Sequence, residues 1–222
     1  MNDRDNHHQN ITRKSIMLLH IHPDNPQPRN INTVVDTLKK GGIIIYPTDT
    51  IYGLGCDIYN TQAIERICRI KNIDPKKAQF SFICADLSHL SEYTKSISTP
   101  VFRILKNSLP GPYTFILEAN KQVPKLLKSK KDTVGIRVPD HKIAQQIIKE
   151  LGHPIMSVSL PMDGDIEYYT DPEVMHDLFS SQVDIVIEGG PGNVTPSTVI
   201  DCTSGTPELI REGAGEWTSL VV

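Results

Sequence analysis

The stretch GGIIIYPTDTIYGLG, residues 41–55, begins as an apolar run and continues into a polar turn bounded by glycines. Residues 43–46 have the composition of a buried β-strand, and Pro47 marks its end. In the simplest interpretation the rest is a bend, for which Gly53 and Gly55 supply turn conformations.

A second interpretation uses the position of this turn. Ligand crevices form at the carboxyl ends of strands in open α/β sheets. There, Thr48, Asp49 and Thr50 would place three short polar side chains beside bare backbone. Such a turn suits a small polar ligand such as an amino acid, and the residues alone leave both interpretations open.

Strand-like and helix-like segments alternate along the chain. Helical periodicity occurs at 31–40, at 62–71 after a cap at Asn60 or Thr61, and at 141–151. Runs with strand character occur at 16–21, 43–46, 80–84, 113–117, 134–138, 155–159, 183–187 and 198–201. The alternation predicts an α/β sheet.

The last strands predict a mixed sheet. After residue 183 the chain between them is too short for helical crossovers, so they are expected to pair partly antiparallel. We therefore expect one α/β domain over 15–222: a twisted mixed parallel/antiparallel sheet with flanking helices and an open concave basic cleft. Residues 1–14 are expected to be a disordered tail, and 160–172 a mobile surface loop.

Composition excludes several classes of protein. The formal net charge of -3 gives no global basic field, so a nucleic-acid surface would have to be local. The four cysteines are widely spaced, which favours buried thiols in a reducing compartment over a zinc site or disulfides, and no protein-ligated metal is expected. The polar start and the lack of a long apolar run predict a cytoplasmic protein without membrane contact.

One short segment, RICRIKNIDPKK at 66–77, is strongly basic. Its cations are Arg66, Arg69, Lys71, Lys76 and Lys77. Cations at a helix C-terminus stabilise the helix dipole, so a solvated basic end is one interpretation. Lysines that close over a nucleotide polyphosphate are the other.

Three later segments carry weaker signals. The segment IEGGPGNVTPSTVID at 187–201 could present N–H groups to an anion, but it is neither a Walker A loop nor a dinucleotide fingerprint. Ser157 and Ser159 share one face of a predicted strand, either as sheet-edge residues or as hydroxyl ligands. The lysines of 121–131 form either a solvated helix face or a polyanion patch.

The ordered set of motifs resembles the YrdC/YciO family of threonylcarbamoyl-AMP synthases, from about Ser15 onward. The set comprises YPTDTIYGLG, the helix ending at Lys71 with Lys77 beyond it, PGPYTFIL, GIRVPDH, and PSTVID followed by IREGAG. The resemblance implies a reaction of L-threonine, bicarbonate and ATP that yields threonylcarbamoyl-AMP and pyrophosphate for tRNA modification. Magnesium would arrive on the ATP.

The resemblance also implies roles for individual residues. Lys71 and Lys77 would be catalytic. Threonine would be held by Thr50, Arg137, Ser157 and Ser197, and ATP by Lys71, Lys77, Thr114, Ser159 and Arg211. The family's association with tRNA or double-stranded RNA suggests Arg66, Arg69 and Lys76 as RNA contacts.

Several positions depart from the synthase pattern. Ile73 replaces a phosphate-contacting arginine, Phe82 a histidine beside threonine, Pro161 the asparagine of the SxN signature, and Pro196 a glutamate. These changes resemble the YciO branch. The alternative function is therefore a nucleotide- or double-stranded-RNA-binding protein on the same scaffold without synthase activity.

Overall fold

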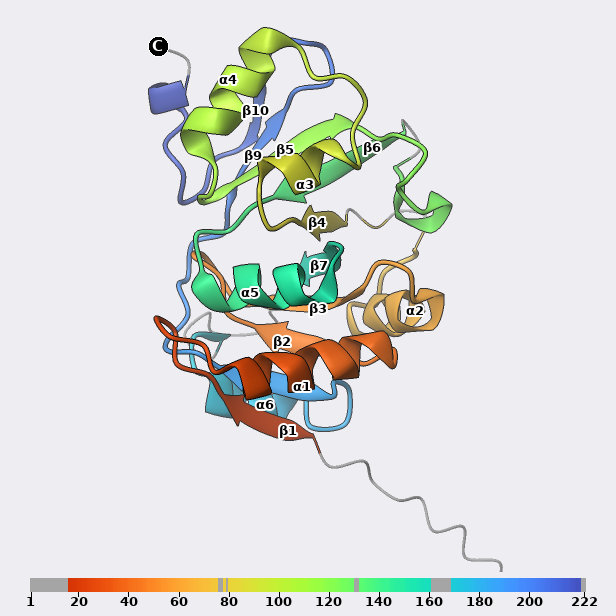
Figure 1. Ribbon diagram of the computed structural model, residues 1–222, viewed down its shortest axis with the longest axis vertical. Coiled ribbons are helices and arrows are strands. Elements are labelled where there is room, and N and C mark those ends of the chain that lie inside the picture. Colours follow the sequence, from red (N-terminus) through yellow and green to blue (C-terminus); the bar gives the residue numbers. More distant parts are fainter. Residues whose placement is uncertain (1–15, 76–77, 79, 130–131, 161–168, 221–222) are drawn as a thin grey trace, which may run out of the picture.

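The protein folds as one mixed ten-stranded sheet flanked by helices (Figure 1). The computed structural model describes residues 16–75, 78, 80–129, 132–160 and 169–220. The strands are β1 (Met17–His20), β2 (Ile44–Tyr46), β3 (Gly53–Asp57), β4 (Ser81–Ile83), β5 (Tyr113–Glu118), β6 (Thr133–Arg137), β7 (Ile155–Ser159), β8 (Ile185–Glu188), β9 (Thr198–Asp201) and β10 (Glu208–Arg211). The helices are α1 (Pro28–Lys39), α2 (Thr61–Ile70), α3 (Leu87–Ser91), α4 (Thr99–Ser108), α5 (Lys142–Leu151) and α6 (Pro172–Leu178), with short 3-10 turns η1 (Lys125–Leu127) and η3 (Thr218–Leu220).

The strand order is β1-β8-β2-β3-β7-β4-β6-β5-β9-β10. The sheet contains both parallel pairs, such as β4–β6 and β5–β9, and antiparallel pairs, such as β3–β7 and β5–β6. The prediction of a single α/β domain with a mixed sheet is therefore confirmed. The predicted tail at 1–14 and most of the predicted loop at 160–172 lie outside the described residues.

The predicted helices are present, and local chemistry sets their ends. Asn60 caps α2, because its Oδ1 accepts a hydrogen bond from the N–H of Ala63 at 2.9 Å. Pro28 occupies the first turn of α1, where its missing N–H costs nothing. After α5, Gly152 takes the left-handed conformation at φ 84°.

The opening motif folds differently from its simplest interpretation. Gly53 and Gly55 are not turn residues: they lie in β3, which pairs antiparallel with β2, and neither has a positive φ. The bend is confined to 47–52. These two glycines let the ring of Tyr46 pack closely against β3 and do not serve an unusual backbone conformation.

The strands β8 and β9 are consecutive in the chain but lie in different halves of the sheet. β8 pairs in parallel with β1 and β2, whereas β9 pairs in parallel with β5 and antiparallel with β10. The expectation that the last strands pair partly antiparallel is confirmed by β9 with β10. β8 and β9 do not pair with each other, because residues 189–197 carry the chain across the sheet between them.

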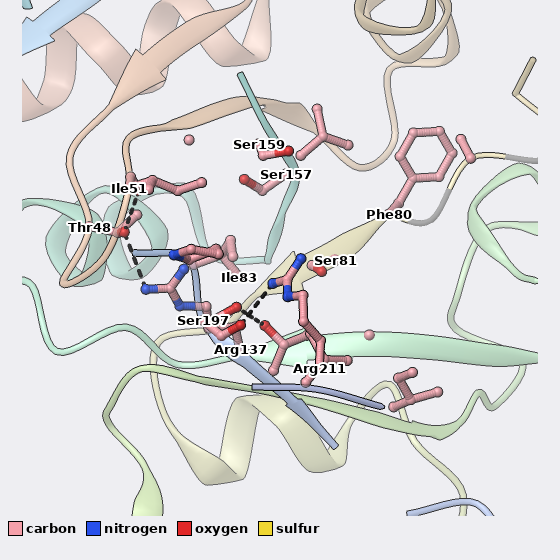
Figure 2. A pocket seen from close by; sticks show the side chains of 18 of the residues that line it. Thr48, Ile51, Phe80, Ser81, Ile83, Arg137, Ser157, Ser159, Ser197 and Arg211 are labelled. Carbon is pink, nitrogen blue, oxygen red and sulfur yellow. Dashed lines mark hydrogen bonds between the residues drawn. The ribbon is translucent and has the colours of Figure 1, made fainter. Parts of the chain in front are cut away.

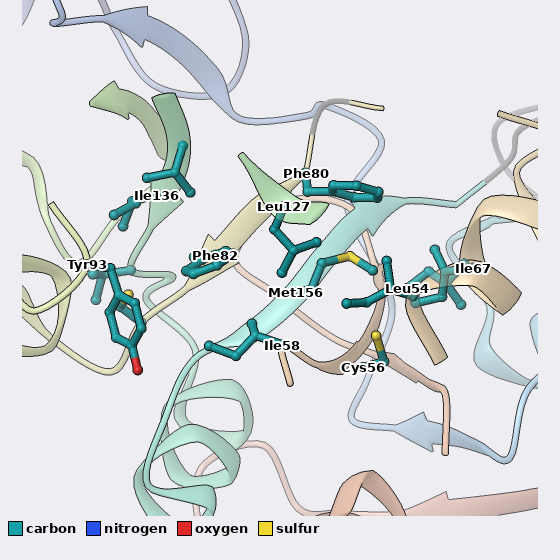
Figure 3. Packing of buried hydrophobic residues seen from close by; sticks show 14 of the residues in the cluster. Leu54, Cys56, Ile58, Ile67, Phe80, Phe82, Tyr93, Leu127, Ile136 and Met156 are labelled. Atoms are coloured by element: carbon teal, nitrogen blue, oxygen red, sulfur yellow. The ribbon is translucent and has the colours of Figure 1, made fainter. Parts of the chain in front are cut away.

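Two hydrophobic layers cover the two faces of the sheet. On one face α1 and α5 pack side by side, and Val34 and Ile147 belong to the same buried cluster as the strand residues Ile44 and Ile185 (Figure 1). The other face packs against α2, α3, α4 and α6; Phe82 belongs to this layer (Figure 3). Because α1 and α5 cover only part of their face, the rest is available for a pocket.

Candidate functional site

A pocket of about 350 Å³ opens on the face that α1 and α5 leave uncovered (Figure 2). Its wall is formed by alternate residues of most of the central strands, together with the loops that flank them. The polar lining residues are Tyr46, Thr48, Tyr52, Ser81, Thr114, Ser129, Thr133, Arg137, Ser157, Ser159, Ser197 and Arg211.

The floor of this pocket is a row of small residues across three neighbouring strands. In register, Ser157 on β7 lies opposite Ser81 on β4, and Ser81 lies opposite Gly135 on β6. A Cβ on Gly135 would lie 3.2 Å from the Oγ of Ser81. The small side chains leave the sheet face hollow here, where larger ones fill it under α1 and α5.

Tyr46 packs its ring against the glycines of β3. A Cβ on Gly53 would lie 2.8 Å from the ring, so only glycine leaves room for it. The phenol donates a 2.7 Å hydrogen bond to the Oγ of Ser157 and so fixes that hydroxyl at the pocket wall. Burial raises the pKa of Tyr46 to about 12, which keeps the phenol protonated as a donor.

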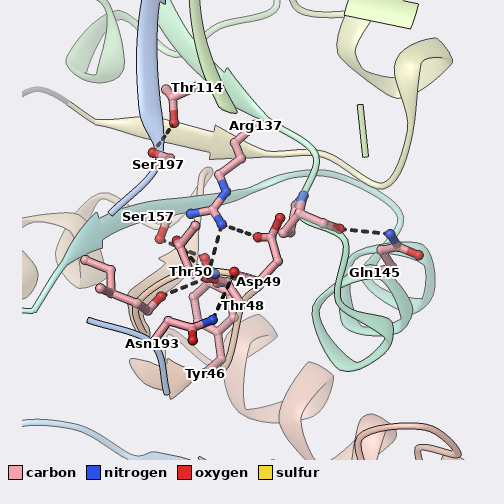
Figure 4. A network of polar contacts seen from close by, with 12 residues as sticks. Tyr46, Thr48, Asp49, Thr50, Thr114, Arg137, Gln145, Ser157, Asn193 and Ser197 are labelled. Carbon is pink, nitrogen blue, oxygen red and sulfur yellow. Dashed lines mark hydrogen bonds and ion pairs between the residues drawn. The ribbon is translucent and has the colours of Figure 1, made fainter. Parts of the chain in front are cut away.

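Arg137 reaches the turn of the opening motif from β6. Its Nη2 donates to the Oγ1 of Thr48 at 3.2 Å and forms an ion pair with Asp49 (Figure 4). The side chains of Arg137 and Asp49 are only 9% and 12% exposed. Thr50 lies behind Thr48: it is fully buried, its N–H donates to the Oγ1 of Thr48, and it is not part of the pocket wall.

Arg211 enters the pocket because of a β-bulge. On β10, Leu209 lies opposite Ile200 and Arg211 opposite Val199, so Ile210 is an extra residue. Without it Arg211 would point to the other face, since side chains alternate along a strand. Its Nη2 donates to the carbonyl of Ser197 at 2.8 Å.

The segment after Arg211 is fastened to β9. The Oγ1 of Thr198 accepts the N–H groups of Gly213 at 2.9 Å and Gly215 at 3.0 Å, and donates to the carbonyl of Gly215. Beside it, the hydroxyls of Thr114 and Ser197 lie 2.8 Å apart. The PSTVID and IREGAG motifs thus form one hydrogen-bonded unit at the pocket's edge.

Most of the residues that the sequence singled out meet in this pocket. The residues on its wall are Thr114, Arg137, Ser157, Ser159, Ser197 and Arg211. Lys71 is not on the wall, and its Nζ donates to the carbonyl of Leu160 at 3.2 Å. Lys76 and Lys77 lie outside the described residues, so their predicted roles stay predictions.

Two of the three suggested RNA contacts, Arg66 and Arg69, lie on α2. Arg69 is exposed. Arg66 donates to the carbonyls of Gly41 and Gln182 and pairs with the buried carboxylate of Asp184 at 3.3 Å, which ties α2 to the neighbouring loops.

Two of the departures from the synthase pattern are not in the pocket. The placement of Phe82 beside a ligand is wrong: in β4 it is Ser81 and Ile83 that face the pocket, and Phe82 is fully buried on the opposite face, edge-on to Tyr93. Ile73 packs against the hydrophobic core. Pro196 does line the pocket, and Pro161 lies outside the described residues.

Sequence reasoning missed three features of the site: the buried donor Tyr46, the floor residue Ser81, and the ion pair of Asp49 with Arg137. Ser81 had a usable signal, because it is the one hydroxyl in the run FSFIC at 80–84. The other two depend on contacts between segments far apart in the chain.

Within the described residues, no helix has the length and apolar character to span a membrane, and no group of three or more His, Cys, Asp and Glu could hold a metal ion. The four cysteines are buried and unbridged.

Known proteins resemble this chain over most of its length. YciO of Escherichia coli strain K12 is 48% identical over 198 residues, which cover 89% of this chain and 95% of that protein. A threonylcarbamoyl-AMP synthase of Vibrio vulnificus strain YJ016 is 34% identical over 187 residues, covering 83% of this chain and 98% of that protein.

Solved structures agree with these relatives. The crystal structure of Escherichia coli YciO has a TM-score of 0.86 at 44% identity and covers 93% of this chain and 100% of its own. P. abyssi Sua5 complexed with L-threonine has a TM-score of 0.80 at 25% identity and covers 92% of this chain and 59% of its own. The Sua5/YciO/YrdC family model, described as telomere recombination, matches residues 36–213. The chain belongs to the Sua5/YciO/YrdC family.

Proposed function

We propose that the protein is an L-threonylcarbamoyladenylate synthase-like enzyme that uses L-threonine, bicarbonate and ATP in the modification of tRNA. The observation that carries the proposal is the single pocket that collects Arg137, Ser157, Ser197, Thr114 and Arg211 from separate strands. It is supported by the 34% identity to a threonylcarbamoyl-AMP synthase and by the similarity to a Sua5 bound to L-threonine.

The pocket offers suitable groups for each reactant. The amine of threonine would condense with bicarbonate to give a carbamate and water. A carbamate oxygen would then attack the α-phosphorus of ATP and release pyrophosphate together with its magnesium ion. Arg137 and the hydroxyl of Ser157 would orient the amino acid, and Arg211 would stabilise phosphate charge. Lys77 would assist the departing pyrophosphate.

The test is pyrophosphate release from ATP that requires both L-threonine and bicarbonate. Arg211→Gln should lower kcat/KM at least 10-fold, because it removes a charged donor worth about 1.5–3 kcal/mol. Arg69→Gln, which removes the same charge from an exposed position outside the pocket, is the matched control. Folded wild-type protein that releases no pyrophosphate above buffer would refute the proposal.

The positions of Lys71 and Ile73 favour a second function. Lys71 donates to a backbone carbonyl and Ile73 packs on the core, so neither residue contributes to the pocket wall. A YciO-type protein that binds nucleotide or double-stranded RNA without the synthase reaction would fit this arrangement. Calorimetric titration separates the two: a synthase should bind ATP more tightly with threonine and bicarbonate, whereas a simple binder should not respond. RNA binding should weaken steeply with salt.

A further inference from the structure

The two arginines of the pocket differ in how their charge is compensated. Arg137 forms an ion pair with Asp49, and both side chains are nearly buried. Arg211 donates to the carbonyl of Ser197, which is a neutral partner. Among the described residues no carboxylate forms an ion pair with Arg211. The pocket therefore has a neutral end and a cationic end.

Burial makes this difference significant. Water screens a buried pair of charges weakly, so the carboxylate of Asp49 offsets much of the positive charge that Arg137 would otherwise present to a ligand. One of its oxygens, Oδ2, is buried and has no hydrogen-bond partner within the described part of the chain. Among the described residues, Arg137 is therefore the one donor to this carboxylate.

The backbone around Asp49 is held by two hydrogen bonds from Asn193. The backbone carbonyl of Asp49 accepts a hydrogen bond from the Nδ2 of Asn193 at 3.2 Å, and the N–H of Asn193 donates to the carbonyl of Thr50 at 3.3 Å. Segment 189–197 thus holds the turn against β6 from outside (Figure 4). The contacts of Asn193 fix the backbone of Asp49, and the ion pair with Arg137 holds its carboxylate.

We propose that Asp49 is a specificity-determining residue that selects ligands by charge at the Arg137 end of the pocket. A neutral ion pair suits a ligand with no net charge, such as a zwitterionic amino acid, whose carboxylate can still accept N–H bonds from the guanidinium. Asp49 is not on the pocket wall, but its ion pair offsets the positive charge that Arg137 presents there, so a multiply charged phosphate binds at Arg211 instead. The assignment of these two ligand classes rests on the proposed function.

The first test uses the wild-type protein and inorganic phosphate. The Nε–H signals of the arginine side chains are followed by NMR during the titration and assigned with Arg137→Lys and Arg211→Lys. Phosphate should shift the Arg211 signal and leave that of Arg137 in place. A shift at Arg137 at the same or lower phosphate concentration, or no shift at either arginine, would overturn the proposal.

The second test removes the negative charge of Asp49. Asp49→Asn should raise the affinity for inorganic phosphate at least 10-fold and make phosphate compete with L-threonine, whereas the two bind independently in the wild type. Asp140→Asn is the matched control, because this exposed residue lies three positions from Arg137 in the chain and makes the same change in net charge. Equal phosphate affinities in the two variants would contradict the assigned role.

The tests remain informative if the Asp49→Asn variant does not fold or if the proposed synthase function fails. If Asp49→Asn does not fold, as monitored by circular dichroism, the wild-type titration still decides the question. If the protein binds phosphate at Arg211 but releases no pyrophosphate from ATP, the synthase function fails while the charge selection stands. If the protein releases pyrophosphate from ATP but binds phosphate at Arg137, the synthase function stands while the charge selection fails.

Discussion

Replacing Gly53 with alanine tests the packing that supports the pocket. The new methyl group would lie 2.8 Å from Cε1 and 2.9 Å from Cζ of the buried Tyr46 ring. The ring would have to shift, and overpacking of this kind costs about 1–3 kcal/mol. Alanine also lowers the conformational entropy of the unfolded chain, which stabilises the folded protein by about 0.4–1 kcal/mol. We therefore expect a net loss of about 0–2.6 kcal/mol, with a central value near 1.3.

The assay is urea-induced unfolding, supported by thermal melts. A loss near 1.3 kcal/mol corresponds to a decrease in Tm of roughly 3–5 °C in a protein of this size. The matched variant is Gly55→Ala, whose methyl group would lie 3.1 Å from the same ring and should cost less. Because the clash is with Tyr46, the cost of Gly53→Ala should disappear in a Tyr46→Leu background. An undiminished cost there would refute the explanation.

Two further predictions concern other buried polar groups. Asp184→Ala should destabilise the protein by about 1–3 kcal/mol in urea unfolding. The reason is that the buried N–H of Ile43, which donates to Asp184 at 2.8 Å, loses its acceptor. Arg66→Ala, which removes the partly exposed partner of Asp184, should destabilise the protein less. The folded pKa of Tyr46 lies above its ordinary value, so the unfolded chain loses its proton first as pH rises. The free energy of unfolding should therefore decrease above pH 10, by up to about 1.4 kcal/mol per pH unit towards pH 12. The Tyr46→Phe variant should show a shallower decrease.

The sequence predicted those parts of the structure that local patterns determine. The helix at 62–71 carries both its apolar face and its capping asparagine within a dozen residues, and it formed as expected. The apolar runs became strands because burial on both faces requires such composition. The separation of β8 from β9 could not be predicted, because the route of segment 189–197 is decided by distant contacts.

The same distinction explains the candidate site. Arg137 and Ser157 could be identified from motifs, and alternation along the strand places them on one face. Phe82 was assigned to the pocket by motif position, although alternation would have placed it opposite Ser81 and Ile83. The pairing of Asp49 with Arg137 joins residues 88 positions apart and leaves no local signal.

The pocket is assembled from nearly the whole chain, from Tyr46 on β2 to Arg211 on β10. Contacts this distant in sequence form late, because the intervening chain must first be ordered. A nascent or truncated chain that lacks β10 would contain the opening motif but no completed site. Ligand binding should therefore report on folding of the entire domain, and a ligand that binds only this state will raise its melting temperature.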